Sequence, residues 1–187
     1  IASYQKAITI NPHNAEAYNN IGVVQKSKGD LDAAIKSYQR AIQIKPDYVD
    51  VYNNMGSALN GNGEQDAAIK CYQQVLQIKP NYTDAYLNIG VVKKKKGDLE
   101  GAIVNFKQAL KIEPDNAEVY YNLGVIRQDI GELVAAITNY KQSVKVKPSF
   151  EIASVQKLHL QAHICDWASI LKDRTNIAKL GTLTQQV

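Results

Sequence analysis

The stretch Ala15–Tyr48 reads AEAYNNIGVVQKSKGDLDAAIKSYQRAIQIKPDY, and its pattern returns along the chain with a period of 34 residues. All five prolines keep this spacing, at Pro12, Pro46, Pro80, Pro114 and Pro148. So do one set of tyrosines and two sets of glycines: Tyr18, Tyr52, Tyr86 and Tyr120; Gly22, Gly56, Gly90 and Gly124; Gly29, Gly63, Gly97 and Gly131. A fixed period of this length is typical of a repeat array, in which each unit buries its apolar face by stacking on its neighbours.

One repeat is expected to contain two helices. In Ala15–Lys28 the apolar residues recur at intervals of three and four, which favours a helix with one buried face. Gly29 accepts the left-handed conformation that ends such a helix, and Asp30 can cap the start of the next one. The second amphipathic helix stops before Pro46, because proline lacks an N–H group and disfavours helix at the residue before it. Each unit is therefore a helix-turn-helix.

These residues resemble the tetratricopeptide repeat (TPR) family. Its pattern has an aromatic residue at position four, Leu-Gly at seven and eight, Ala at twenty, an aromatic at twenty-four, Ala at twenty-seven and Pro at thirty-two. With Ala15 as position one, the first full repeat supplies Tyr18, Ile21, Gly22, Ala34, Tyr38, Ala41 and Pro46. The usual aromatic at position eleven is replaced in the four repeats by Gln25, Leu59, Lys93 and Arg127. The resemblance implies an all-α, right-handed superhelical solenoid whose first helices line a concave, protein-binding face.

The repeat pattern predicts the division of the chain. Residues 1–14 are a partial repeat with a second helix only, and four full repeats follow at 15–48, 49–82, 83–116 and 117–150. Residues 151–187 are expected to be degenerate capping or linker helices. In this segment we expect helices at Glu151–Ile164 and Trp167–Leu180, with Asp166 as N-cap and Gly181 as C-terminal stop. Trp167 is suited to covering the last apolar face.

Position six of each first helix is asparagine without exception. This asparagine ladder consists of Asn20, Asn54, Asn88 and Asn122. An amide offers both donors and an acceptor, so a row of amides can pair with the N–H and C=O groups of an extended peptide backbone. Since asparagine is a mediocre helix former, its recurrence favours a binding role. The alternative is that each asparagine satisfies a neighbouring backbone group.

Position two is acidic in every full repeat, at Glu16, Asp50, Asp84 and Glu118. Carboxylates in the first turn of a helix are stabilised by its macrodipole, which explains them without a ligand. The functional alternative is an acidic edge that selects basic or hydroxyl-rich peptides. Family members that clamp a C-terminal carboxylate use basic residues on this face; positions two, five, six and nine carry none here.

Composition and motifs exclude several classes of function. The net charge of +4 is a mild excess, and Lys93–Lys96 reads as a solvated helix end, so we do not expect nucleic-acid binding. The spacing of His159, His163 and Cys165 lacks an evident fourth ligand, so no metal or other cofactor is expected. No catalytic set stands out. Without a membrane span, a signal peptide or a disulfide framework, the chain is expected to be cytoplasmic.

A second resemblance concerns Cys165-Asp166-Trp167, directly after the last repeat. This element is similar to the junction of O-linked N-acetylglucosamine transferases and Spindly-like glycosyltransferases, whose repeats precede the catalytic region and carry an asparagine ladder. The resemblance implies a non-catalytic arm that recruits polypeptide substrates, in a longer protein with more repeats upstream. The alternatives are a stand-alone scaffold for complex assembly and self-association through Ile1, Tyr4 and Ile8 of the half repeat.

The turn of the second repeat, Asn60-Gly61-Asn62-Gly63, carries an extra glycine that should fray the end of its first helix. We expect this turn to be the most mobile point between the repeats. Amide hydrogen exchange should be faster here than at the turns containing Gly29, Gly97 and Gly131. Equal protection at all four turns would contradict the prediction.

Overall fold

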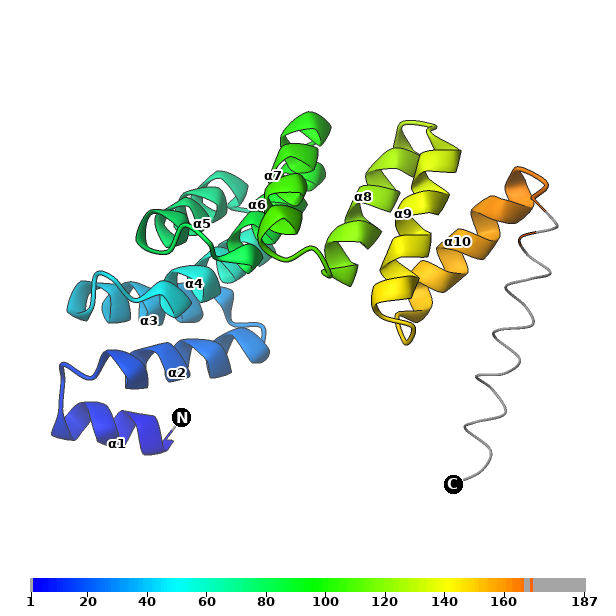
Figure 1. Cartoon of the computed structure of the whole chain (residues 1–187). Coiled ribbons are helices and arrows are strands. Elements are labelled where there is room, and N and C mark those ends of the chain that lie inside the picture. Colours follow the sequence, from blue (N-terminus) through cyan, green and yellow to red (C-terminus); the bar gives the residue numbers. More distant parts are fainter. Residues whose placement is uncertain (1, 167–168, 170–187) are drawn as a thin grey trace, which may run out of the picture. The chain divides into compact units, whose positions relative to one another are not determined.

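The computed structural model of the chain describes residues 2–166 and 169, and within them it contains ten helices and no strand (Figure 1). The helices are α1 (Ala2–Ile10), α2 (Ala15–Ser27), α3 (Leu31–Ile44), α4 (Val49–Gly61), α5 (Gln65–Ile78), α6 (Thr83–Lys95), α7 (Leu99–Ile112), α8 (Ala117–Asp129), α9 (Leu133–Val146) and α10 (Glu151–His163). The all-α class expected from the period is confirmed. The helix pairs fall within the repeats expected from the sequence, and we keep that division as our proposal.

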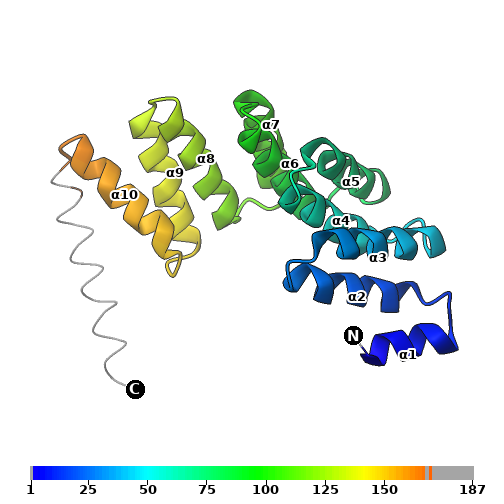
Figure 2. The same cartoon turned by 180° about the vertical axis from the view of Figure 1, so that it is seen from behind.

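The helices belong to two compact units, Ile1–Glu113 and Pro114–Val187. In the first unit each helix from α1 to α7 packs on the next, and the first helices α2, α4 and α6 also contact one another in sequence. In the second unit α9 packs between α8 and α10, which Figure 2 shows from behind. Stacking of successive helix pairs makes the chain an all-α helical-repeat solenoid.

Inside each full repeat, a glycine of the first helix faces an aromatic ring of the second. The pairs are Gly22 with Tyr38, Gly56 with Tyr72, Gly90 with Phe106 and Gly124 with Tyr140. A Cβ added at Gly90 would lie 2.5 Å from the Phe106 ring, and at the other three sites it would lie 2.5 to 2.7 Å from the facing ring. These rings are almost fully buried. The small residue therefore sets how closely the two helices approach.

The glycine in the turn inside each repeat adopts the left-handed conformation that the sequence predicts. Gly29, Gly63, Gly97 and Gly131 adopt φ between 82° and 86°, a conformation that other residues reach only with strain. Asp30 Oδ1 accepts a hydrogen bond from Ala33 N at 3.2 Å and so caps α3. The helix before this turn ends at Ser27 and Lys28 is its C-cap, one residue earlier than expected.

The turns between repeats are of two kinds. Three of them read Lys-Pro-x-aromatic and place the lysine ammonium over the ring, at 4.8 Å from its centroid for Lys45 and Tyr48. The other two end in an asparagine whose side chain caps the following helix, at Asn14 and Asn116. Both arrangements fix the start of the next first helix, one by cation–π attraction and one by a hydrogen bond.

The extra glycine of the second full repeat, Gly61, does not shorten the first helix of that repeat. The helix α4 extends to Gly61 and has 13 residues, as α2 and α6 do. A Cβ at Gly61 would lie 3.2 Å from Leu31 Cδ1, so the glycine lies close to the neighbouring second helix. The mobility of this turn stays a prediction.

The helix expected at Glu151–Ile164 is confirmed as α10, which ends one residue earlier, at His163. Asp166 Oδ1 accepts a hydrogen bond from Ser169 N at 3.3 Å, the bond expected of an N-cap. The expected helix Trp167–Leu180, its stop at Gly181 and the covering role of Trp167 lie outside the described residues.

The glycine–ring contact gives a stability prediction. Gly90→Leu would drive a side chain into Phe106 and should cost ~1–3 kcal/mol of unfolding free energy, loosening the central repeats first. Urea unfolding of the variant and of wild type measures this cost. Because Phe106→Leu makes room at the same place, the loss in the double variant should be smaller than the sum of the two single losses. A thermal midpoint of Gly90→Leu equal to that of wild type would show that the crossing is looser than the structure implies.

Candidate peptide-binding face on the first helices

The asparagine ladder is distributed over four first helices, one residue on each of α2, α4, α6 and α8. Asn20, Asn54 and Asn88 belong to the first unit and are half-buried, with part of each side chain open to solvent. Asn122 belongs to the second unit and is only 6% exposed. The four residues therefore share a repeat position but not the same surroundings.

Two ladder amides are hydrogen-bonded to the preceding repeat. Asn54 Nδ2 donates to Asn19 Oδ1 at 3.1 Å, and Asn88 Nδ2 donates to Asn53 Oδ1 at 3.0 Å. In both bonds the acceptor is the asparagine at position five, directly before the ladder residue of its own helix. Each donating nitrogen carries a second N–H, and each ladder Oδ1 keeps its acceptor capacity. Asn54 and Asn88 can thus hold their neighbours and still offer polar groups to a ligand.

Asn122 makes a different bond. Its Nδ2 donates to Glu118 O, one turn earlier in α8, at 3.0 Å. This bond satisfies a backbone group of the helix to which Asn122 belongs.

The acidic residues at position two are all exposed, and the charges of those in the first unit act on the hydroxyl groups of two tyrosines. The pKa of Tyr48 is raised, first by burial and then by the carboxylates of Glu16 and Asp50. The pKa of Tyr82 is raised in the same way, with Asp84 and Asp50 as the charges. A cavity of about 280 Å³ is lined in part by Tyr82 and Asp84. The acidic edge of the first unit therefore alternates with phenol groups, which the sequence reading did not include.

The position-five asparagines Asn19 and Asn53 were also missing from the sequence prediction. This position does not keep one residue type along the chain, because the later repeats have Leu87 and Tyr121 there. The only signal was the doublet Asn-Asn in the first two full repeats. Which of the two amides would reach the neighbouring repeat could not be read from that doublet.

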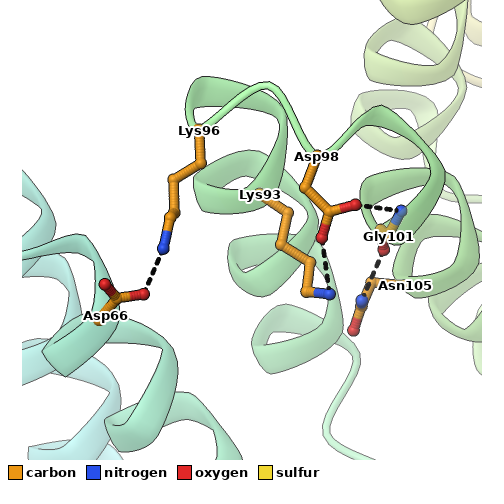
Figure 3. A network of polar contacts seen from close by, with 6 residues as sticks. All are labelled: Asp66, Lys93, Lys96, Asp98, Gly101 and Asn105. Carbon is orange, nitrogen blue, oxygen red and sulfur yellow. Dashed lines mark hydrogen bonds and ion pairs between the residues drawn. The ribbon is translucent and has the colours of Figure 1, made fainter.

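The lysine run at the end of α6 takes part in ion pairs. Lys93 Nζ lies 3.0 Å from Asp98 Oδ2, and Lys96 pairs with Asp66 on α5 of the preceding repeat (Figure 3). Asp98 also caps α7, since its Oδ1 accepts from Gly101 N at 2.8 Å. The run therefore links the turn to the helices on either side, in addition to the favourable charge at a helix C-terminus.

The histidines and the cysteine singled out in the sequence do not come together with a third ligand within the described residues. His159, His163 and Cys165 are exposed, and no group of three His, Cys, Asp or Glu residues within 2–166 and 169 is placed to hold a metal ion. In that same part, every helix is too short or too polar to cross a membrane.

On α1, the surface considered for self-association is open to solvent in part. Tyr4 is 37% exposed and Ile10 is 86% exposed, whereas Ile8 is half-buried. Ile1 lies outside the described residues. Self-association stays a prediction.

Family models now identify the repeats. A model described as "TPR repeat" matches residues 1–29, 26–63, 59–97 and 92–131, and a second, described as "Tetratricopeptide repeat", matches residues 117–150. The chain belongs to the tetratricopeptide repeat family. Membership confirms the first resemblance drawn from the sequence and indicates a protein-interaction scaffold. No curated protein sequence matches the chain.

Solved structures of similar fold include one described as a TPR protein. A crystal structure of MamA is 24% identical, with a TM-score of 0.71, and the match covers 78% of this chain and 85% of that one. MamA residues 41–end from Desulfovibrio magneticus RS-1 is 20% identical, with a TM-score of 0.73 and coverage of 92% and 97%. YrrB, "a TPR protein with an unusual peptide-binding site", is 19% identical, with a TM-score of 0.67 and coverage of 86% and 82%. At these identities the likeness supports the TPR fold. None of these matches is to a glycosyltransferase, so they lend no support to the second resemblance.

The Asp98 ion pair gives a pH prediction. The pKa of Asp98 is lowered, first by the hydrogen bond from Lys93 and then by the one from Gly101 N. Its stabilising contribution is therefore complete above the unfolded-state pKa, near ~4, and is lost as the pH falls through the lower folded-state value. Asp98→Asn and Lys93→Met should each make the fall in Tm shallower between about pH 5 and pH 2. An unchanged slope in both variants would show that the pair does not form in solution.

Proposed function

We propose that the first-helix face of this solenoid binds an extended polypeptide by its backbone. The observation that carries the proposal is the asparagine ladder, Asn20, Asn54, Asn88 and Asn122, with its members on α4 and α6 bonded to the repeat before them. A backbone presents N–H and C=O groups at regular intervals whatever its sequence. A row of amides that offer both a donor and an acceptor is complementary to it.

The strength of such binding can be bounded. A hydrogen bond contributes a net ~0.5–1.5 kcal/mol, so four rungs give about 4 kcal/mol. That corresponds to a Kd of roughly a millimolar before the cost of ordering the peptide is subtracted. Binding by these repeats alone is therefore weak, and further rungs would increase the affinity.

The acidic edge adds a preference for particular side chains. Glu16, Asp50, Asp84 and Glu118 lie four residues before the ladder asparagines, one helical turn away on the same face. Exposed carboxylates accept hydrogen bonds, so the edge favours peptides with basic or hydroxyl-bearing side chains. If these acids serve only the helix macrodipole, their replacement will alter stability and leave peptide affinity unchanged.

YrrB, a TPR protein with an unusual peptide-binding site, offers a precedent on the same fold. On the sequence resemblance alone, we also propose that the chain acts as a non-catalytic, cytoplasmic recruiting arm of a glycosyltransferase. That resemblance depends on Cys165-Asp166-Trp167, and Trp167 lies outside the described residues. The rival proposal is a scaffold for complex assembly in which the ladder plays no part.

Titration of a peptide followed by NMR separates backbone binding by the ladder from a scaffold in which the ladder plays no part. The probe is a 12-residue, uncharged, unstructured peptide of Ser, Thr and Ala, compared with the same peptide N-methylated at alternate backbone positions. Wild type should bind the first peptide at roughly millimolar Kd and the second more weakly, because N-methylation removes the backbone donors. The quadruple variant that replaces all four ladder asparagines by alanine should lose binding.

A matched control is Asn105→Ala on the second helix α7, where the amide donates to Gly101 O at 2.7 Å and lies off the first helices. It should bind the peptide as wild type does. An unchanged affinity of the quadruple variant would refute the role of the ladder and favour the scaffold.

A further inference from the structure

The two bonds between successive repeats have a consistent direction. In each, the ladder residue is the donor and the position-five asparagine of the preceding repeat is the acceptor: Asn54 to Asn19, and Asn88 to Asn53. All four amides lie in the first unit, on helices that contact one another in sequence. The same geometry occurring twice indicates that position five has a defined task.

Such a bond fixes the orientation of the donating amide. An asparagine amide is planar, and its terminal torsion is otherwise broad, so that nitrogen and oxygen can exchange places. Once one N–H points at the preceding repeat, the directions of Oδ1 and of the second N–H are set as well. A peptide then meets an amide that is already aligned and does not have to be ordered on binding.

Asn122, the ladder residue of the second unit, is bonded differently. Its amide nitrogen donates to the backbone oxygen of Glu118 in its own helix. Asn122 is also the ladder residue described as buried, at 6% exposure. The ladder thus contains residues aligned by a neighbouring repeat and one held by its own helix.

We propose that Asn19 and Asn53 are positioning residues, which align the amides of Asn54 and Asn88 for an extended peptide backbone. The peptide is then bound mainly along α2, α4 and α6, and Asn122 contributes less to the affinity than its repeat position suggests. The inference rests on the proposed function and adds to it the part of the ladder that receives the peptide. Since ordering a side chain on binding costs roughly 2- to 12-fold in affinity, alignment in advance should be measurable at each rung.

The test uses the same uncharged Ser/Thr/Ala peptide and variants of one pair. Asn88→Ala removes a rung and should weaken binding by about 2- to 12-fold. Asn53→Leu, which gives the second repeat the residue found at this position in the third, should weaken binding within the same range. Asn53→Asp keeps a side-chain oxygen acceptor and should restore most of the affinity. Asn122→Ala should have a smaller effect than Asn88→Ala.

A double-variant cycle distinguishes positioning from a general structural effect. If Asn53 acts through Asn88, then Asn53→Leu adds nothing to the loss already caused by Asn88→Ala. A merely destabilising substitution would weaken binding further in that background. Full additivity of the two losses would therefore overturn the proposal.

The free protein provides a second readout. One side-chain N–H of Asn88 should exchange slowly with solvent in wild type and in Asn53→Asp, and quickly in Asn53→Leu. Quick exchange in wild type would contradict the inference whatever the peptide does. If Asn88→Ala binds like wild type, the proposed function fails and the inference with it. If Asn88→Ala weakens binding but Asn53→Leu binds like wild type, the inference fails and the proposed function stands.

Discussion

Contact between a glycine and an aromatic ring determines the geometry of every full repeat. Phe106 and its three tyrosine counterparts occupy the space that a side chain on the facing helix would need, which leaves a Cβ as little as 2.5 Å from the ring. Close approach buries each ring almost completely, and apolar burial of this kind is the main source of stability in a small helical unit. The faces turned toward other molecules depend on this spacing, because it fixes where each first helix lies relative to its partner.

Polar contacts between repeats then align these units in the first part of the chain. The Asn54–Asn19 bond lies on the first helices, and Lys96 pairs with Asp66 near the turns. Asn62 Nδ2 donates to Asp32 Oδ1 at 3.2 Å at the corresponding place one repeat earlier. The two contacts near the turns are exposed and add little stability each. Their effect is to define which side chains of neighbouring repeats meet, and so to align the surface that a ligand would contact.

The sequence alone predicted what depends on contacts within one repeat. The period gave the helix pairs, Gly29 and Asp30 gave the turn between them, and Glu151 gave the start of α10 to the residue. Binding residues were harder to predict, because the partner of Asn54 lies 35 residues away in a neighbouring repeat. Period identity finds positions that never vary; it cannot find a position such as that of Asn53, whose residue changes along the array.

The second full repeat is complementary to itself. In the contacts with neighbouring repeats, its Asn54 and Asn62 are donors and its Asn53 and Asp66 are acceptors. A tandem copy of residues 49–82 placed after the original would therefore find a matching partner for each of these groups without any substitution. Internal duplication of this segment could lengthen the array in one genetic step, and the duplicated unit would inherit both the contacts that align it and the amide it displays.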